Sequence, residues 1–175
     1  LKVGPAVKTI GAFAFEDTKL TGVDLSEATA LVEIGQGAFF ATDLGGTLVI
    51  PAKVTTIGDD AFADTELTGT LKVGFGVHTI GHAAFASTKL TRLDLSEATA
   101  LVSIGDYAFG DSTDLQGKLV IPSTVTTIGA YAFYNTKLTG LDLSKAPSLV
   151  SIGDYAFVGL HGHDVRRPYS APRLS

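Results

Sequence analysis

Residues 48–62 read LVIPAKVTTIGDDAF, and the second half of this stretch contains a pattern that recurs along the chain. The pattern Ile-Gly-x-x-Ala-Phe begins seven times, at Ile10, Ile34, Ile57, Ile80, Ile104, Ile128 and Ile152. Successive copies therefore begin 23 or 24 positions apart. A period of about 20 to 50 residues is typical of a solenoid, a propeller or another repeat array. We therefore expect one continuous array.

Two short strands are predicted in each repeat. Apolar alternation over 48–50 predicts a strand whose Leu48 and Ile50 side chains face inward. Pro51 cannot donate to a strand ladder and is expected to end this strand. The β-branched run over 54–57 predicts a second strand. A single coil of this length cannot bury both of its faces alone, so successive coils must stack.

The Ala-Phe half of the pattern predicts a turn and a buried ladder. Gly58 permits a sharp change of direction, and residues 59–63 are expected to form a helical or 3-10 turn. Stacking at about 4.8 Å would bring equivalent side chains into register. The expected internal aromatic ladder consists of Phe15, Phe39, Phe62, Phe85, Phe109, Phe133 and Phe157.

Threonines form a second recurring column, two residues before an apolar leucine. We expect these side chains at an inward corner, with hydroxyls that satisfy buried backbone groups of the neighbouring coil. The column consists of Thr18, Thr42, Thr65, Thr88, Thr113 and Thr136.

Composition excludes several classes of protein. Hydrophobic residues make up 45% of the 175 residues and charged residues 18%, which argues against disorder of the array. The net charge of −5 argues against generic binding to nucleic acid or an anionic membrane. No apolar run approaches the ~20 residues that span a bilayer. No P-loop, nucleophile elbow or dinucleotide fingerprint is present, so we predict no catalytic residue, cofactor or metal site.

The stretches 48–62 and 119–133 share the pattern Leu-x-Ile-Pro-x-x-Val-x-x-Ile-Gly-x-x-Ala-Phe, which resembles the BspA-like (Treponema-type) leucine-rich repeats. Members of that family typically carry Cys or Asn near the end of the Ala-Phe segment, where this chain has Thr. The resemblance implies a curved or flattened solenoid. It also implies a surface or secreted protein that adheres to other proteins or cells, without catalytic residues.

The expected organisation is a leucine-rich-repeat-like, β-rich solenoid over positions 1–159, built from seven coils, each about 23–24 residues long. We expect it to be a fragment of a longer array, followed by a flexible, non-repeat tail over 160–175. Similar segments lie 70 or 71 positions apart, which indicates that a block of three coils has duplicated. The matching pairs are 1–4 with 71–74, 23–30 with 93–100, and 48–51 with 119–122.

The middle residue of the first strand is expected to point outward on every coil. This column consists of Lys2, Asp24, Val49, Lys72, Asp94, Val120 and Asp142. It has two interpretations: a solvated face with ion pairs between adjacent rungs, or a strip that binds a ligand.

On the second interpretation, the candidate partner-binding residues are Lys72, Phe75, Arg92, Asp94 and Val120. An exposed Phe75 beside Arg92 would suit a protein contact. Phe75 could instead tuck against its turn.

Tyr107, Tyr131 and Tyr155 precede Ala-Phe on three consecutive coils and form a second candidate surface. Tyrosine combines contact area with a polar tip, which suits the binding of proteins or sugars. The alternative is that the rings lie flat and cover the edge of the turns.

The leading functional hypothesis is a noncatalytic protein-interaction or adhesion module whose partner is a protein or another cell-surface ligand. The alternative is a structural scaffold or spacer without a ligand site. Ice binding through threonine columns is a remote third possibility, because Glu33, Ser103 and Ser151 interrupt one column. We also expect edge-to-edge self-association, because an uncapped edge strand presents unpaired backbone groups.

Overall fold

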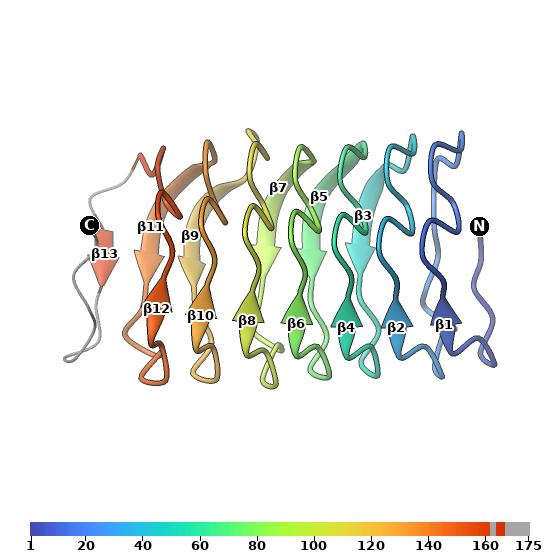
Figure 1. Ribbon diagram of the computed structural model, residues 1–175, viewed down its shortest axis with the longest axis horizontal. Helices are drawn as coiled ribbons and strands as arrows, with labels where there is room; N and C mark the ends of the chain where they lie inside the picture. The colour runs from blue at the N-terminus through green and yellow to red at the C-terminus, as the bar shows by residue number, and fades with distance from the viewer. Residues whose placement is uncertain (162–163, 167–175) are drawn as a thin grey trace.

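The computed structural model describes residues 1–161 and the backbone of 164–166, and shows stacked coils along one axis. Figure 1 shows the coils side by side with little curvature and two layers of strands that face each other. Among the described residues there is no α-helix or 3-10 helix, and none of their segments meets the length and apolarity needed for a membrane-crossing helix.

Seven two-residue strands form one continuous parallel sheet, one strand from each coil. Its order is β1 (Thr9–Ile10), β2 (Glu33–Ile34), β4 (Thr56–Ile57), β6 (Thr79–Ile80), β8 (Ser103–Ile104), β10 (Thr127–Ile128) and β12 (Ser151–Ile152). The isoleucines pair in register, as in Ile34↔Ile57. The strand predicted over 54–57 is confirmed only for its last two residues, because the Val54 amide donates to the Pro51 carbonyl and closes a turn.

The opposite layer contains longer strands in two separate parallel sheets. One sheet consists of β3 (Gly46–Val49), β5 (Leu67–Lys72) and β7 (Lys89–Asp94). The other consists of β9 (Gln116–Val120), β11 (Lys137–Asp142) and β13 (Asp164–Arg166). The predicted alternation over 48–50 is confirmed, since Leu48 and Ile50 are buried while Val49 is 58% exposed.

This layer is interrupted between β7 and β9, although they belong to successive coils. The interruption coincides with a change in the size of the loops that follow the strands. Ile104 follows Leu95 by nine positions, whereas Ile128 follows Ile121 by seven, so a wide loop precedes a tight one. The same change of loop size occurs between the second and third coils, after Leu25 and after Ile50. Asp24 of the second coil bridges to Lys2 of the first coil, and β3 of the third coil is an edge strand that does not pair with the second coil.

The predicted phenylalanine ladder is confirmed as the centre of the core. Neighbouring rings stack with centroids 5.0 to 5.4 Å apart and planes 4 to 12° from parallel. The five inner rings, from Phe39 to Phe133, have no exposed surface. Burial of one phenylalanine contributes about 1.5–3 kcal/mol, so this column is a main source of cohesion between coils.

The helical or 3-10 turn expected in each Ala-Phe segment is not what the chain forms. In the first coil the amides of Phe13, Phe15 and Asp17 donate to carbonyls of the second coil at 2.8 to 2.9 Å. The amides of Ala14 and Glu16 donate three residues back. Phe13 and Asp17 have φ of 57° and 54°, and this backbone alternation directs every second amide to the next coil. A helix would keep those bonds within its own segment.

The threonine column is buried from Thr42 to Thr88 and at Thr136, while Thr18 in the first coil is exposed. The hydroxyls have a different partner from the expected one. Each donates at 2.8 to 3.1 Å to a phenylalanine carbonyl three residues earlier in its own coil; the donors are Thr18, Thr42, Thr65, Thr88 and Thr136. The placement of Thr113 was wrong. An extra residue in that coil puts Ser112 at the inward corner, where Ser112 is fully buried and Thr113 is exposed.

The tail expected over 160–175 lies mostly outside the described residues. The backbone of Asp164–Arg166 forms β13, which pairs in parallel with β11.

Candidate interaction surface

Four of the eight candidate residues surround one groove of about 750 Å³: Lys72, Arg92, Asp94 and Val120. The groove lies at the interruption between β7 and β9. Pro122, in the tight loop of the β9 coil, also lines it. The groove is therefore a consequence of the interrupted sheet.

Two wide loops bound this recess. The loop after β7 is held by Asp94, whose carboxylate accepts the Ser96 amide at 3.0 Å, and by the Ala98 amide, which donates to the Leu95 carbonyl. The loop after β11 begins in the same way and contributes Lys145 to the groove lining. The tight loop between these wide loops leaves the space unfilled.

The charge around the groove is positive although the chain carries a net charge of −5. Lys72, Arg92 and Lys145 are exposed, and in the described part of the chain none of them forms an ion pair. Lys118 also lines the groove, and its ammonium lies 3.2 Å from an Asp142 carboxylate oxygen.

Asp94 does not offset these charges as an ion-pair partner at close range. Hydrogen bonds from the Ser96 side chain and amide hold the pKa of the Asp94 carboxyl below its usual value, and the charges of Lys72 and Arg92 act in the same direction. The carboxylate is thus engaged by its own loop, while the neighbouring cations face solvent.

The predicted register of the outward column is confirmed, but the expected ion pairs are not the ones formed. Lys2 lies beside Asp24, and Lys72 beside Asp94. The Lys2 ammonium instead bonds the Glu27 carboxylate at 2.8 Å. The carboxylates of Asp24 and Asp94 each accept a hydrogen bond from the backbone amide two residues later. These bonds orient both carboxylates toward their own loops.

Phe75 is exposed but does not line the groove. It sits in the tight loop after β5, and its side chain is 57% exposed, so it is not tucked against the turn. A Cβ atom at Gly74 would lie 2.7 Å from the Ile50 carbonyl oxygen. A Cβ atom at Gly76 would lie 2.3 Å from the Ala52 carbonyl oxygen. Close approach of two loops therefore requires glycine on both sides of this exposed ring.

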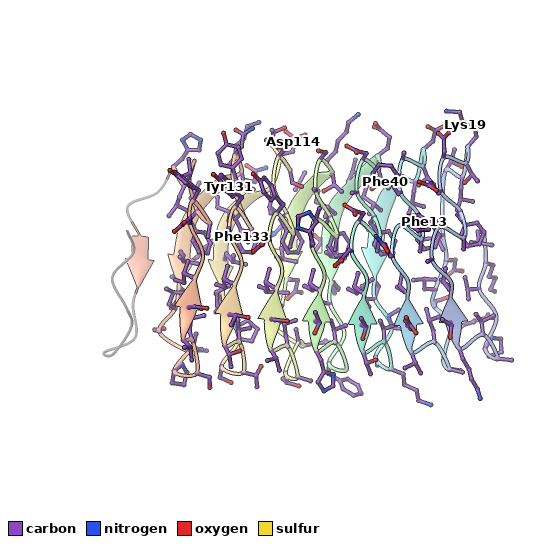
Figure 2. All side chains as sticks on the ribbon, in the orientation of Figure 1. Phe13, Lys19, Phe40, Asp114, Tyr131 and Phe133 are labelled. Carbon is purple, nitrogen blue, oxygen red and sulfur yellow. The ribbon has the colours of Figure 1, made fainter. Side chains whose placement is uncertain are left out.

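The three candidate tyrosines also lie away from the groove lining. Their rings stack in a row: Tyr131 is 4.7 Å from Tyr107 and 5.0 Å from Tyr155, between ring centroids. Figure 2 shows Tyr131 and Phe13, which precede Ala-Phe in different coils, on the side of the array that carries these turns. Desolvation, and then the charges of Tyr107 and Tyr155, raise the pKa of Tyr131. Stacking occupies both faces of the central ring, so it cannot serve as a flat platform for another ring.

A second groove of about 700 Å³ repeats the first at the other interruption of the layer. It is lined by Asp24, Ser26, Val49 and Pro51, which lie 70 or 71 positions before Asp94, Ser96, Val120 and Pro122. Sequence reasoning identified the duplicated block but missed both grooves, Lys118 and Lys145. The available signal was the difference in loop length between successive coils.

Metal-ligating side chains do not converge among the described residues, where no group of three or more His, Cys, Asp or Glu is arranged to hold an ion. The grooves are open recesses lined by strand and loop residues. Such a surface is suited to binding through contact area and charge.

The pattern that describes a BspA type leucine rich repeat region matches residues 1–73 and 78–163 in six copies. No curated protein is similar enough to match. A solved leucine rich cell surface protein from Faecalibacterium prausnitzii is similar at 19% identity and a TM-score of 0.47, over 95% of this chain and 60% of that one. A solved leucine-rich repeat protein from Bacteroides ovatus is similar at 22% identity and a TM-score of 0.43, over 91% of this chain and 53% of that one. The chain thus spans between half and two thirds of either structure.

Proposed function

Because this chain belongs to the BspA-type leucine-rich repeat family, we propose that it is a noncatalytic protein-interaction module. In this proposal the module is part of a surface or secreted protein, and it contributes to adhesion by binding a protein on another cell. The face that binds is the interrupted layer of longer strands.

One observation carries the proposal: residues from several coils surround one open groove. Lys72, Arg92 and Val120 come from three successive coils and line the same recess. Val120 is 43% exposed between the charged residues, so the groove combines apolar contact with charge. Solenoids commonly bind partners through extended surfaces of this kind.

The test uses fluorescently labelled protein titrated onto intact cells, with and without prior protease treatment of the cells. Saturable binding that protease treatment removes is expected, because the proposed partner is a protein. Val120→Asp should weaken this binding, since it places a carboxylate on the apolar part of the groove. Val150→Asp is the matched control, because Val150 is 73% exposed and does not line the groove.

A structural scaffold is the second candidate, and the continuous seven-stranded sheet and aromatic ladder favour it. Both features would make the array a stiff rod. A scaffold predicts that binding to cells is not saturable, or that Val120→Asp and Val150→Asp leave it equally unchanged. Either result would reject the interaction module.

A further inference from the structure

We propose that the groove between β7 and β9 binds an extended acidic polypeptide segment, and that the second groove does not. This inference rests on the proposed function, because it assigns a ligand chemistry to the same face. It is carried by the comparison of two grooves with the same backbone plan and different charges.

The two grooves share their walls but differ at the positions that carry positive charge. Arg92 corresponds to Gly22, and Lys118 corresponds to Thr47. Lys72 corresponds to Lys2, whose ammonium is engaged by Glu27 at 2.8 Å.

Lys145 corresponds to Phe75, which lies in a tight loop and does not line the second groove. Lys53 is the lysine that lines the second groove. In the groove between β7 and β9, three cations form no ion pair with a described residue: Lys72, Arg92 and Lys145. In the second groove, Lys53 is the one such cation among the described residues.

The spacing of the cations fits a chain that runs along the array. Lys72, Arg92 and Lys145 belong to the fourth, fifth and seventh coils, so they span three rungs, or about 14 Å at the strand spacing. An extended polypeptide covers that distance with about five residues at about 3.4 Å each. Its alternate side chains would point to the same side, toward the cations and Val120.

The lining of the groove favours a peptide over a sulfated polysaccharide, although both are anionic. None of the described residues that line the groove is aromatic, so a sugar ring has no aromatic face to pack against there. Leu93, which is half-buried, and the exposed Val120 instead offer aliphatic surface between the charges. Aliphatic surface suits the methylene groups of glutamate side chains whose carboxylates reach the cations.

The experiment is calorimetric titration of the whole chain with a capped hexapeptide that alternates glutamate and leucine. One peptide is expected to bind each chain, and binding is expected to weaken as salt is raised, because exposed charges are screened. Arg92→Gln, Lys72→Gln and Lys145→Gln should each weaken binding by about threefold. The triple variant should weaken it by about 30-fold if the sites act independently.

Three variants serve as controls. Lys8→Gln removes an equal charge from an exposed residue next to the seven-stranded sheet, and Lys53→Gln removes one from the second groove. Both should bind the hexapeptide like the wild type. Arg92→Lys keeps the charge and should also bind nearly as well, which separates loss of charge from loss of packing.

Several results would overturn the proposal. Two peptides per chain, or equal weakening by Lys8→Gln, would show that charge in this groove does not select the ligand. If heparin bound in a way that depended on Arg92 and the hexapeptide did not bind, the groove would be assigned to a polysaccharide. Cell binding that depends on Val120 without any peptide binding would reject this inference and leave the proposed function standing.

Discussion

The hydroxyl oxygens of Thr88 and Ser112 lie 2.9 Å apart in the interior of the array and join two successive coils. Both hydroxyls also lie within hydrogen-bond distance of the Phe85 carbonyl oxygen, at 3.1 Å from Thr88 and 2.9 Å from Ser112. Ser112 reaches this position because its coil contains one more residue between Phe109 and Leu115 than the other coils have there. The extra residue is thus absorbed without an unsatisfied buried hydroxyl.

Ser112→Ala is expected to lower the free energy of unfolding by about 1 kcal/mol, because one buried hydrogen-bonded hydroxyl is lost while Thr88 still serves Phe85. Urea denaturation measures this change. Thr113→Ala is the matched control and should change the free energy by less than about 0.5 kcal/mol, because Thr113 is exposed. A larger cost for Thr113 would contradict the assignment of Ser112 to the inward corner.

Gly129→Ala is expected to destabilise the array by about 1–3 kcal/mol, the usual cost of forcing extra volume into a packed site. A Cβ atom there would lie 2.4 Å from the Asp106 amide nitrogen of the preceding coil. Gly11 occupies the same repeat position in the first coil, and a Cβ atom added there would have no neighbouring atom within 4 Å. Gly11→Ala should therefore be nearly neutral in thermal unfolding. Equal costs at both positions would mean that coil stacking is not what requires glycine.

Phe85→Ala is expected to lower the free energy of unfolding by about 3–5 kcal/mol, because it leaves a cavity in the aromatic ladder. Phe85 is fully buried and stacks on Phe62 and Phe109. Phe75→Ala, at a ring that is 57% exposed, should have little effect on stability. Circular dichroism during urea unfolding compares the two variants directly. A small effect at Phe85 would remove the ladder as the main cohesive element.

Asp142 predicts a dependence of stability on acid pH. Hydrogen bonds from the Ser144 side chain and amide, and then Lys118, lower the pKa of the Asp142 carboxyl from 3.8 to about 2. Because the folded pKa is the lower one, the carboxylate stabilises the fold above about pH 4, and this contribution is lost as pH falls toward 2.

Asp142→Asn should therefore be less stable than the wild type at pH 7, with a difference that shrinks between pH 4 and 2. Ser144→Ala, which removes the hydroxyl hydrogen bond at 2.5 Å, should reduce the same dependence. Urea denaturation at a series of pH values measures both effects. A difference between Asp142→Asn and wild type that stays constant across this range would contradict the assigned role.

The repeat of Ile-Gly-x-x-Ala-Phe and the alternation over 48–50 were sufficient to determine the coils, the inward ladder and the outward column. Each of these features depends on burial that recurs once per period, so the order of residues carries it directly. The sequence also determined where the block of three coils is duplicated. It did not determine the conformation of the Ala-Phe turns, because the bonds that shape them run between coils.

Only the tertiary structure decided which outward residues share a site. The groove at Lys72, Arg92 and Val120 exists because a wide loop precedes a tight one and β7 fails to pair with β9. Lys145 joins these residues from two coils beyond Arg92. A recess of this kind depends on differences between neighbouring coils, whereas a periodic pattern records only what they have in common.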